Sequence, residues 1–169
     1  MQLFKYSLLI LVFISSTLIG KYLSLRYSYR LTELEELKTA LNILKSKIKF
    51  TYEPLPEIFY SITQNTNKNI SKIFLNAINK MKIENASIAW EKSIEEYDGN
   101  LTKEDKQVIK NLSRLLGATD LEGQISQIEV TENFLENQIR QAQEEKNKNE
   151  KLYKKLGSTI GLAIVIILI

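Results

Sequence analysis

The sequence predicts an all-α protein, a six-helix bundle whose first and last helices continue into apolar segments at the two ends of the chain. Through the middle of the chain, apolar residues recur at intervals of three and four, which is typical of helices with one buried face. Each end carries an uncharged apolar run, over residues 6–20 and 156–169. The chain has only 2 prolines, which favours long helices over short strands joined by turns.

The first apolar run, residues 6–20, would form a helix of about 22 Å, shorter than the roughly 30 Å hydrocarbon core of a membrane. Extension through Leu25 gives a full span if the Lys21 side chain reaches the interface. A cleaved signal peptide is the alternative. We favour a retained N-terminal transmembrane anchor over residues 1–25, because no A-x-A-like cleavage site follows and a helical pattern continues directly from Leu23.

The second apolar run, residues 156–169, would be about 21 Å long as a helix. It gains a turn if Lys154 and Lys155 extend to the interface, so a C-terminal transmembrane segment is predicted over residues 152–169. A buried core helix is the usual alternative for so short a run. However, residues 160–169 are apolar on every side, and a small domain cannot bury such a helix completely.

Gly157 and Gly161 form a G-x-x-x-G motif in this second segment. Four residues along a helix is about one turn, so both glycines lie on one face and allow another helix to approach closely. The same motif also occurs commonly by chance.

Basic residues flank both apolar segments on the side of the central domain. The first segment has one basic residue before it and three after it, and five lysines within residues 146–155 precede the second segment. The positive-inside rule therefore places the central domain, residues 26–151, in the cytoplasm. The two segments agree independently on this orientation.

Helix-breaking residues divide the first half of the central domain. The first helix continues from the N-terminal segment and is expected to end near Tyr52, because Pro54 disfavours helical geometry at the residue before it. Pro54 or Pro56 suits the first turn of the second helix. The polar run 64–69 separates the second helix from the third.

Capping residues predict where the later helices begin and end. Asn85 is expected to cap the fourth helix, and Thr102 with Asp105 resembles a capping box for the fifth. Gly117 fits the left-handed position just past the fifth helix, and Asp120 can cap the last one. The inner face of the fourth helix is expected to consist of Ile88, Ala89, Trp90, Ile94 and Tyr97.

The last helix has no breaker between Gln124 and Leu156, so it is predicted to run directly into the C-terminal segment. Its apolar spacing with charged flanks also fits a coiled coil. Because the first and last helices are tied to the same membrane, they are expected to pack side by side and antiparallel.

The composition excludes several kinds of chemistry. Cysteine and histidine are both absent, which removes thiol nucleophiles, disulfides, thiolate or imidazole metal sites and the commonest general base. No phosphate-binding, dinucleotide-binding or zinc-protease motif occurs. The remaining acid–base candidates are the pairs Glu35/Glu36, Glu95/Glu96 and Glu144/Glu145. Adjacent helical residues point about 100° apart, and each pair lies among lysines, so solvated helix surface explains them better. We expect no enzyme activity, cofactor, metal or small-molecule substrate.

The charge distribution also argues against nucleic-acid binding. The formal net charge is +3, but residues 1–30 carry four basic and no acidic side chains. The rest of the chain therefore holds 19 basic against 20 acidic residues. A basic face on the folded part, which nucleic-acid binding would need, is not expected.

Several short motifs occur in a distinctive order. They are Gly20, Arg30, Ile48, Tyr52-Glu53-Pro54-Leu55, Ala89-Trp90-Glu91, Leu116-Gly117 with Asp120 and Gln124, Lys155-Leu156-Gly157 and Gly161-Leu162. In this order and spacing, the chain resembles the stage III sporulation protein AB family of endospore-forming bacteria along nearly its whole length. Pro56 departs from the family pattern and bears only on the start of the second helix.

The resemblance implies a non-enzymatic scaffold subunit in the channel-like assembly that joins mother cell and forespore after engulfment. The family is similar to the F component of type II secretion and type IV pilus machines, an inner-membrane platform with six-helix cytoplasmic domains. The implied partners are a cytoplasmic motor ATPase, other membrane subunits of the complex and membrane lipid, and the implied location is the mother-cell membrane. The alternative function is an extracytoplasmic coiled-coil adaptor released by signal-peptide cleavage.

Four residues are candidates for a partner interface: Gly117, Asp120, Gln124 and Trp90. For Gly117 and Asp120, the favoured explanation is that one residue ends a helix and the other starts the next. For Trp90, the favoured explanation is a core anchor, and a binding hot spot is the alternative.

Overall fold

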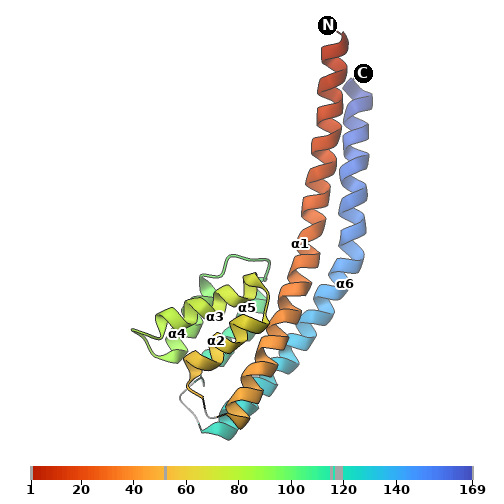
Figure 1. The fold of residues 1–169 in the computed structure, drawn as a ribbon. Helices are drawn as coiled ribbons and strands as arrows, with labels where there is room; N and C mark the ends of the chain where they lie inside the picture. Colours follow the sequence, from red (N-terminus) through yellow and green to blue (C-terminus); the bar gives the residue numbers. More distant parts are fainter. Residues whose placement is uncertain (1, 52, 115, 117–119, 169) are drawn as a thin grey trace. The chain divides into compact units, whose positions relative to one another are not determined.

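The computed structural model describes the chain except residues 1, 52, 115, 117–119 and 169, together with the side chains of residues 2, 3, 5, 114 and 168. Its described residues contain helices and no strand (Figure 1), which confirms the predicted all-α class. The elements are α1 (Gln2–Phe50), α2 (Leu55–Asn65), α3 (Lys68–Lys80), α4 (Ala86–Glu95), α5 (Lys103–Lys110), the 3₁₀ helix η1 (Asn111–Arg114) and α6 (Leu121–Leu168).

The chain divides into two compact units. Unit 1 consists of Met1–Leu31 and Gln141–Ile169, and unit 2 consists of Thr32–Arg140. Helices α1 and α6 each contribute to both units, since each continues without interruption across the division. The predicted continuity of the first and last helices with the terminal segments is therefore confirmed. The units are defined by packing, so the predicted membrane boundaries at residues 25 and 152 stay predictions.

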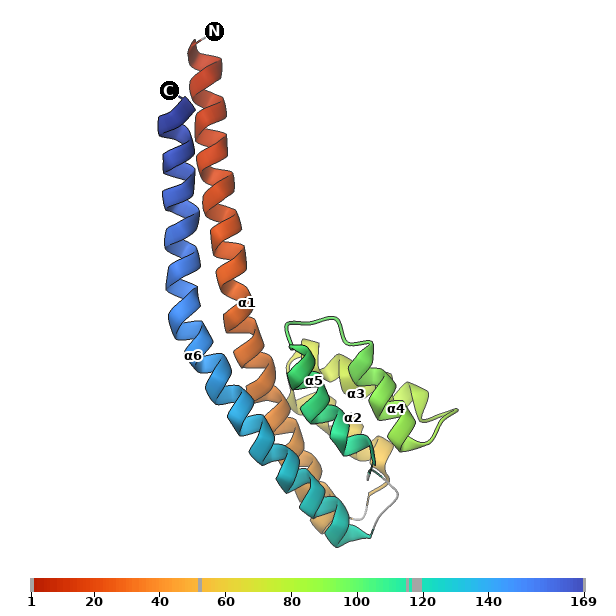
Figure 2. The same ribbon diagram turned by 180° about the vertical axis from the view of Figure 1, so that it is seen from behind.

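The core of unit 2 is built on one stripe of α1. Leu34, Leu37, Leu41 and Leu44 recur at spacings of three and four and are completely buried, as the sequence pattern predicts. Within this unit, α2 to α5 pack as a group against one side of α1 (Figure 2).

An aromatic cluster joins three of these helices. The rings of Phe59, Phe74 and Trp90 come from α2, α3 and α4, and their centroids lie 5.1–5.4 Å apart. All three side chains are completely buried. Close aromatic pairs of this kind add about 0.5–1.5 kcal/mol beyond their buried area, so the cluster is expected to fix the relative positions of α2, α3 and α4.

Two of the predicted caps are confirmed. The Asn85 side chain accepts a hydrogen bond of 2.9 Å from the Ile88 backbone N–H at the start of α4. The Thr102 hydroxyl accepts from the Asp105 N–H at 3.1 Å, and the Asp105 carboxylate accepts from the Thr102 N–H at 2.8 Å. These reciprocal bonds form the capping box of α5, although aspartate replaces the usual glutamate.

The structure corrects the expected inner face of α4. Ile88 is 43% exposed, whereas Ala89, Trp90, Ser93 and Ile94 form the buried face. At 100° per residue, Ile88 lies about 200° from Trp90 around the helix axis, so both cannot point inward.

The fifth helix ends earlier than the position just before Gly117 at which the sequence predicts its end. Helix α5 ends at Lys110 and the chain tightens into η1, with Leu112 still buried. The tighter turn of a 3₁₀ helix is a common way to end an α-helix. The predicted left-handed position of Gly117 lies outside the described residues.

Candidate functional site

In unit 1, the beginning of α1 and the end of α6 form an antiparallel helical hairpin (Figures 1 and 2). The backbones meet at Gly20 and Gly157, where a Cβ atom built on Gly157 would lie 2.8 Å from the Gly20 Cα atom. Real Cβ contacts do not come this close. The absence of a side chain at both positions is therefore what allows this approach.

Ser16 extends the close contact along the G-x-x-x-G face. Its hydroxyl donates a hydrogen bond of 2.7 Å to the Gly157 carbonyl oxygen. A Cβ on Gly161 would lie 3.1 Å from the Ser16 Cβ and 3.2 Å from the ring of Phe13. The predicted close approach of another helix at Gly157 and Gly161 is confirmed, and that helix is α1.

Polar and aromatic pairs continue the hairpin from the glycine contact toward Leu31. The rings of Tyr27 and Tyr153 stack with their centroids 5.8 Å apart. The Arg30 guanidinium, whose side chain is 8% exposed, donates to the Glu145 carboxylate at 2.6 Å. A mostly buried guanidinium needs a partner for its charge, and Glu145 supplies one across the two helices.

The outward surface of the hairpin is strongly apolar. Exposed side chains on it include Phe4, Leu8, Ile10, Leu11, Ile14, Leu18, Ile19, Leu162, Ile164, Ile166 and Ile167. Among the described helices, α1 is long and apolar enough to cross a membrane. The uncharged run at the end of α6 is shorter, and its membrane insertion stays a prediction.

In unit 2, two ion pairs join α1 and α6. Lys38 bonds to Glu136 at 2.6 Å, and Lys45 bonds to Glu132 at 2.5 Å. The two pairs follow one another in opposite order along the two helices, which confirms antiparallel packing in this unit as well. The hydrogen bond from Lys38 lowers the pKa of Glu136 below its usual value.

A buried carboxylate on α1 holds the loop that precedes α5. Glu33 is 1% exposed, and its two oxygens accept hydrogen bonds from the Asn100 backbone N–H at 2.8 Å and the Asn100 side-chain amide at 2.7 Å. Burial, together with the neighbouring Glu33 charge, raises the pKa of Tyr97. Sequence reasoning missed this contact. Its one signal was an acidic residue one position before Leu34 in the buried stripe.

The adjacent glutamates do not share a cleft. The Glu36 carboxylate accepts from the Asn67 backbone N–H at 2.9 Å, while Glu35 is exposed. In the other two pairs, the glutamates bond to separate partners. Glu95 bonds to Lys110, Glu96 to Lys80 and Glu145 to Arg30. These contacts give the carboxylates structural roles at the helix surface.

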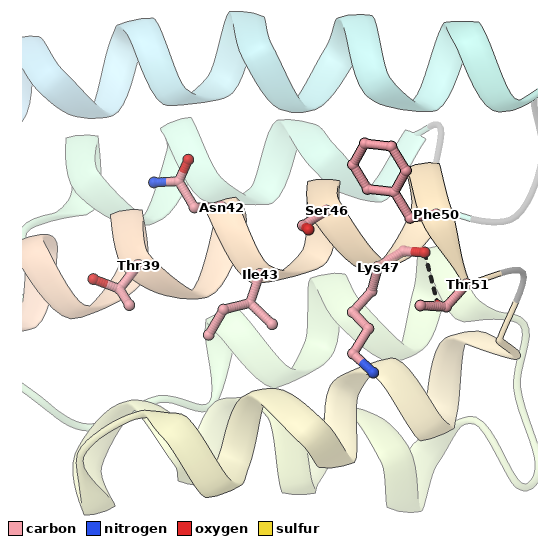
Figure 3. Close-up of a pocket in the computed structure, with 7 residues that line it drawn as sticks. All are labelled: Thr39, Asn42, Ile43, Ser46, Lys47, Phe50 and Thr51. Carbon is pink, nitrogen blue, oxygen red and sulfur yellow. Dashed lines mark hydrogen bonds between the residues drawn. The ribbon is translucent and has the colours of Figure 1, made fainter.

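One face of α1 in unit 2 is uncovered. A hollow of about 460 Å³ is lined by Thr39, Asn42, Ile43, Ser46, Lys47, Phe50 and Thr51, and Figure 3 shows these side chains along the helix. Lys47 is the only charged residue in the lining, and it bonds to Glu53 at 2.9 Å. Phe50, at the end of the face, is 69% exposed. Apart from the paired Lys47, the lining of this face carries no charged side chain, and such a surface suits a protein contact.

Asp120 and Gln124 come together at the start of α6. Asp120 is exposed and immediately precedes the helix, and its carbonyl oxygen accepts from the Gln124 backbone N–H at 3.1 Å. Asp120 thus occupies the N-cap position of α6, and capping by its side chain stays a prediction. A partner-binding role for these two residues stays a prediction, and Gly117 lies outside the described residues.

Trp90 lies away from this corner, in the core. Its side chain is completely buried, and its indole N–H donates to the Ile109 carbonyl oxygen at 3.0 Å. The favoured interpretation as a core anchor therefore agrees with the structure. The ring offers no exposed surface to a partner in this conformation.

The fold and the hairpin define a class: an all-helical protein whose first and last helices pair at their apolar ends. A sequence profile of the stage III sporulation protein AB family matches residues 5–169. The chain therefore belongs to the stage III sporulation protein AB family, which gives it a role in sporulation. This family is not a known enzyme family.

Two known proteins support the assignment. Stage III sporulation protein AB of Bacillus subtilis (strain 168) is 25% identical over 163 residues, covering 94% of this chain and 95% of that protein. A solved structure of stage III sporulation protein AB (SpoIIIAB) aligns with a TM-score of 0.65 at 23% identity, covering 70% of this chain and 96% of that one. The second comparison establishes likeness of fold.

Proposed function

We propose that this protein is a non-enzymatic membrane scaffold of the sporulation-specific, secretion-like channel complex between mother cell and forespore. In this proposal, its helical unit docks the cytoplasmic motor ATPase of the complex, and the protein is required for late forespore development. Family membership supports the sporulation role. The likeness of this family to the F component of secretion platforms, which the family resemblance implies, supports the docking role.

The observation that carries the proposal is the continuity of α1 and α6. Each helix runs without a break from the core of unit 2 into the apolar hairpin of unit 1. A helical unit with its own core, joined to a hairpin with apolar outward side chains by two uninterrupted helices, suits a subunit that holds a cytoplasmic partner at a membrane.

The packing of the first segment supports a retained anchor rather than a cleaved signal peptide. Phe13, Ser16 and Gly20 all contact Gly157 or Gly161 on α6. Removal of the first segment would uncover this face and leave the apolar end of α6 without its partner helix. The extracytoplasmic adaptor, which requires that removal, has no comparable support.

The basic flanks support a mother-cell membrane location with unit 2 in the mother-cell cytoplasm. Both apolar ends have their lysines and arginines on the side of the central domain, as the positive-inside rule requires of a cytoplasmic domain.

A binding experiment tests the docking role. The soluble segment, residues 30–151, and the full-length protein in detergent would each be immobilised and incubated with the purified ATPase of the same sporulation operon. We expect retention of the ATPase by both. If neither form retains it, docking is wrong, and the membrane-scaffold role is tested separately by insertion of the protein into vesicles.

A further inference from the structure

Basic side chains gather on the hairpin next to its apolar ends. In unit 1, the exposed ones are Lys21, Arg26, Lys148, Lys151, Lys154 and Lys155. The acidic residues in the same part of the hairpin are few, and two of them are already engaged: Glu145 bonds to Arg30 and Glu150 bonds to Lys154. This part of the hairpin therefore carries a net positive charge.

Three of these exposed lysines form one face of α6. Lys148, Lys151 and Lys155 are spaced by three and four residues, which places them on the same side of the helix. All three are exposed, and no ion pair is described for any of them in the part of the chain that the structure covers. We call Lys148, Lys151 and Lys155 the lysine face.

Apolar side chains lie beside the lysine face. Leu152 is 48% exposed and Leu156 is 42% exposed, and the uncharged run of α6 begins at Leu156. On α1, Tyr22 is 69% exposed next to Lys21. A zone that combines lysines, leucines and a tyrosine matches the boundary between lipid headgroups and acyl chains. A polyanion such as nucleic acid would gain nothing from the leucines.

We propose that the lysine face binds the headgroups of anionic phospholipids. The phosphodiester group pairs its negative charge with these three exposed lysines, for which no ion pair is described, while Leu152 and Leu156 contact the upper acyl chains. Juxtamembrane lysines near an anionic surface each contribute about a fivefold gain in lipid association. The inference rests on the proposed membrane insertion of the hairpin and is independent of ATPase docking.

The test uses the full-length protein reconstituted into phosphatidylcholine vesicles. Trace amounts of spin-labelled phosphatidylglycerol and spin-labelled phosphatidylcholine are compared by electron spin resonance, which measures the fraction of each lipid held at the protein surface. We expect phosphatidylglycerol to be preferred by about fivefold or more, and the preference to weaken in high salt. In the variant Lys148→Gln/Lys151→Gln/Lys155→Gln, the ratio of phosphatidylglycerol association to phosphatidylcholine association should fall close to one.

Two matched variants distinguish the effect of the lysine face from the effect of the overall positive charge of the protein. Lys68→Gln/Lys72→Gln/Lys103→Gln removes three exposed lysines of unit 2 and should keep the full preference. Lys148→Arg/Lys151→Arg/Lys155→Arg keeps the charge and should keep the preference as well. No preference in the unmodified protein, or equal loss in both glutamine variants, would overturn the inference. Failure of the protein to insert into vesicles would instead refute the proposed membrane scaffold.

Discussion

Gly20 and Gly157 pack so closely that a Cβ atom on Gly20 would lie 2.7 Å from the Gly157 Cα atom. The two residues are far apart in sequence, and the backbones of α1 and α6 come together at them. The hairpin therefore depends on two positions that have no side chain. The Ser16 hydroxyl, bonded to the Gly157 carbonyl oxygen, adds a polar link at the same point.

This geometry predicts a disulfide between engineered cysteines. The chain has no cysteine of its own, so Ser16→Cys/Gly161→Cys introduces a single pair. The Cβ separation at these positions, 3.1 Å, is slightly short of the range of disulfides and needs only a small adjustment. We expect an intramolecular crosslink in oxidised membranes, detected as a mobility shift on a non-reducing gel.

Adding Gly157→Leu to this pair should abolish the crosslink, because the new side chain would enter the space of the Gly20 backbone. Ser16→Cys/Leu162→Cys is the matched control, since Leu162 is 53% exposed. Equal crosslinking of the control pair would show that the helices do not pack as described.

The same contact predicts that the first segment stays in the mature protein. Phe13, Ser16 and Gly20 cover the glycine face of α6, so their removal would expose it. Intact-mass measurement of the protein from sporulating cells should give a chain that begins at Met1 or Gln2. A mature chain that begins after Gly20 would refute the retained anchor and favour the extracytoplasmic adaptor.

Glu33→Ala should destabilise unit 2 markedly. The substitution removes the buried Glu33 carboxylate and leaves the partly buried Asn100 backbone N–H and side-chain amide without their acceptor. Two charge-assisted hydrogen bonds of this kind are worth about 2–4 kcal/mol together, so the free energy of unfolding should fall by about this amount. Trp90, the only tryptophan and completely buried, reports unfolding in urea by its fluorescence.

The control for Glu33 is Glu35→Ala, which removes an exposed carboxylate from the same helix. It should change the free energy of unfolding by less than about 0.5 kcal/mol. A similar loss in both variants would mean that the Glu33 bonds contribute little beyond general charge.

Local signals explain what could be predicted from the sequence. The caps at Asn85 and Thr102 and the leucine stripe of α1 depend on residues within one or two turns, so their spacing reveals them. The Glu33–Asn100 bonds depend on residues 67 positions apart, which no periodicity records. The apolar character of Ile88 predicts the wrong face, because apolar character alone does not fix which side of a helix is buried.

The candidate sites divide in the same way. The G-x-x-x-G of Gly157 and Gly161 predicted a close contact but could not identify its partner, because Gly20 lies on a different helix. Asp120 was placed at a helix start from its neighbours in sequence. The lysine face was visible only as a basic flank, and the structure adds that its lysines share one exposed side of α6.

The Lys38–Glu136 pair predicts a response to acid. The pKa of Glu136 lies below its usual value of 4.5, because Lys38 stabilises the charged carboxylate. The pair therefore contributes its full stability above pH 4.5, and the contribution is lost as the pH falls through the lowered pKa. Carbon-detected NMR titration of the soluble segment should give Glu136 a lower pKa than exposed glutamates. Lys38→Gln should return it to the usual range, and an unchanged value would contradict the pairing.

Substitutions at Asp120 and Gln124 should distinguish a role of this corner in folding from a role in partner recognition. Asp120→Ala removes the residue at the N-cap position of α6 and should lower the free energy of unfolding by about 1 kcal/mol. Gln124→Ala keeps that cap and places a residue of high helix propensity in the first turn of α6, and its free energy of unfolding is measured beside that of the unmodified protein. If this corner contacts a partner, Gln124→Ala lowers the yield of heat-resistant spores in cells that contain normal amounts of the protein. Normal spore yield with normal stability would leave Asp120 as a helix cap and would refute recognition by Gln124.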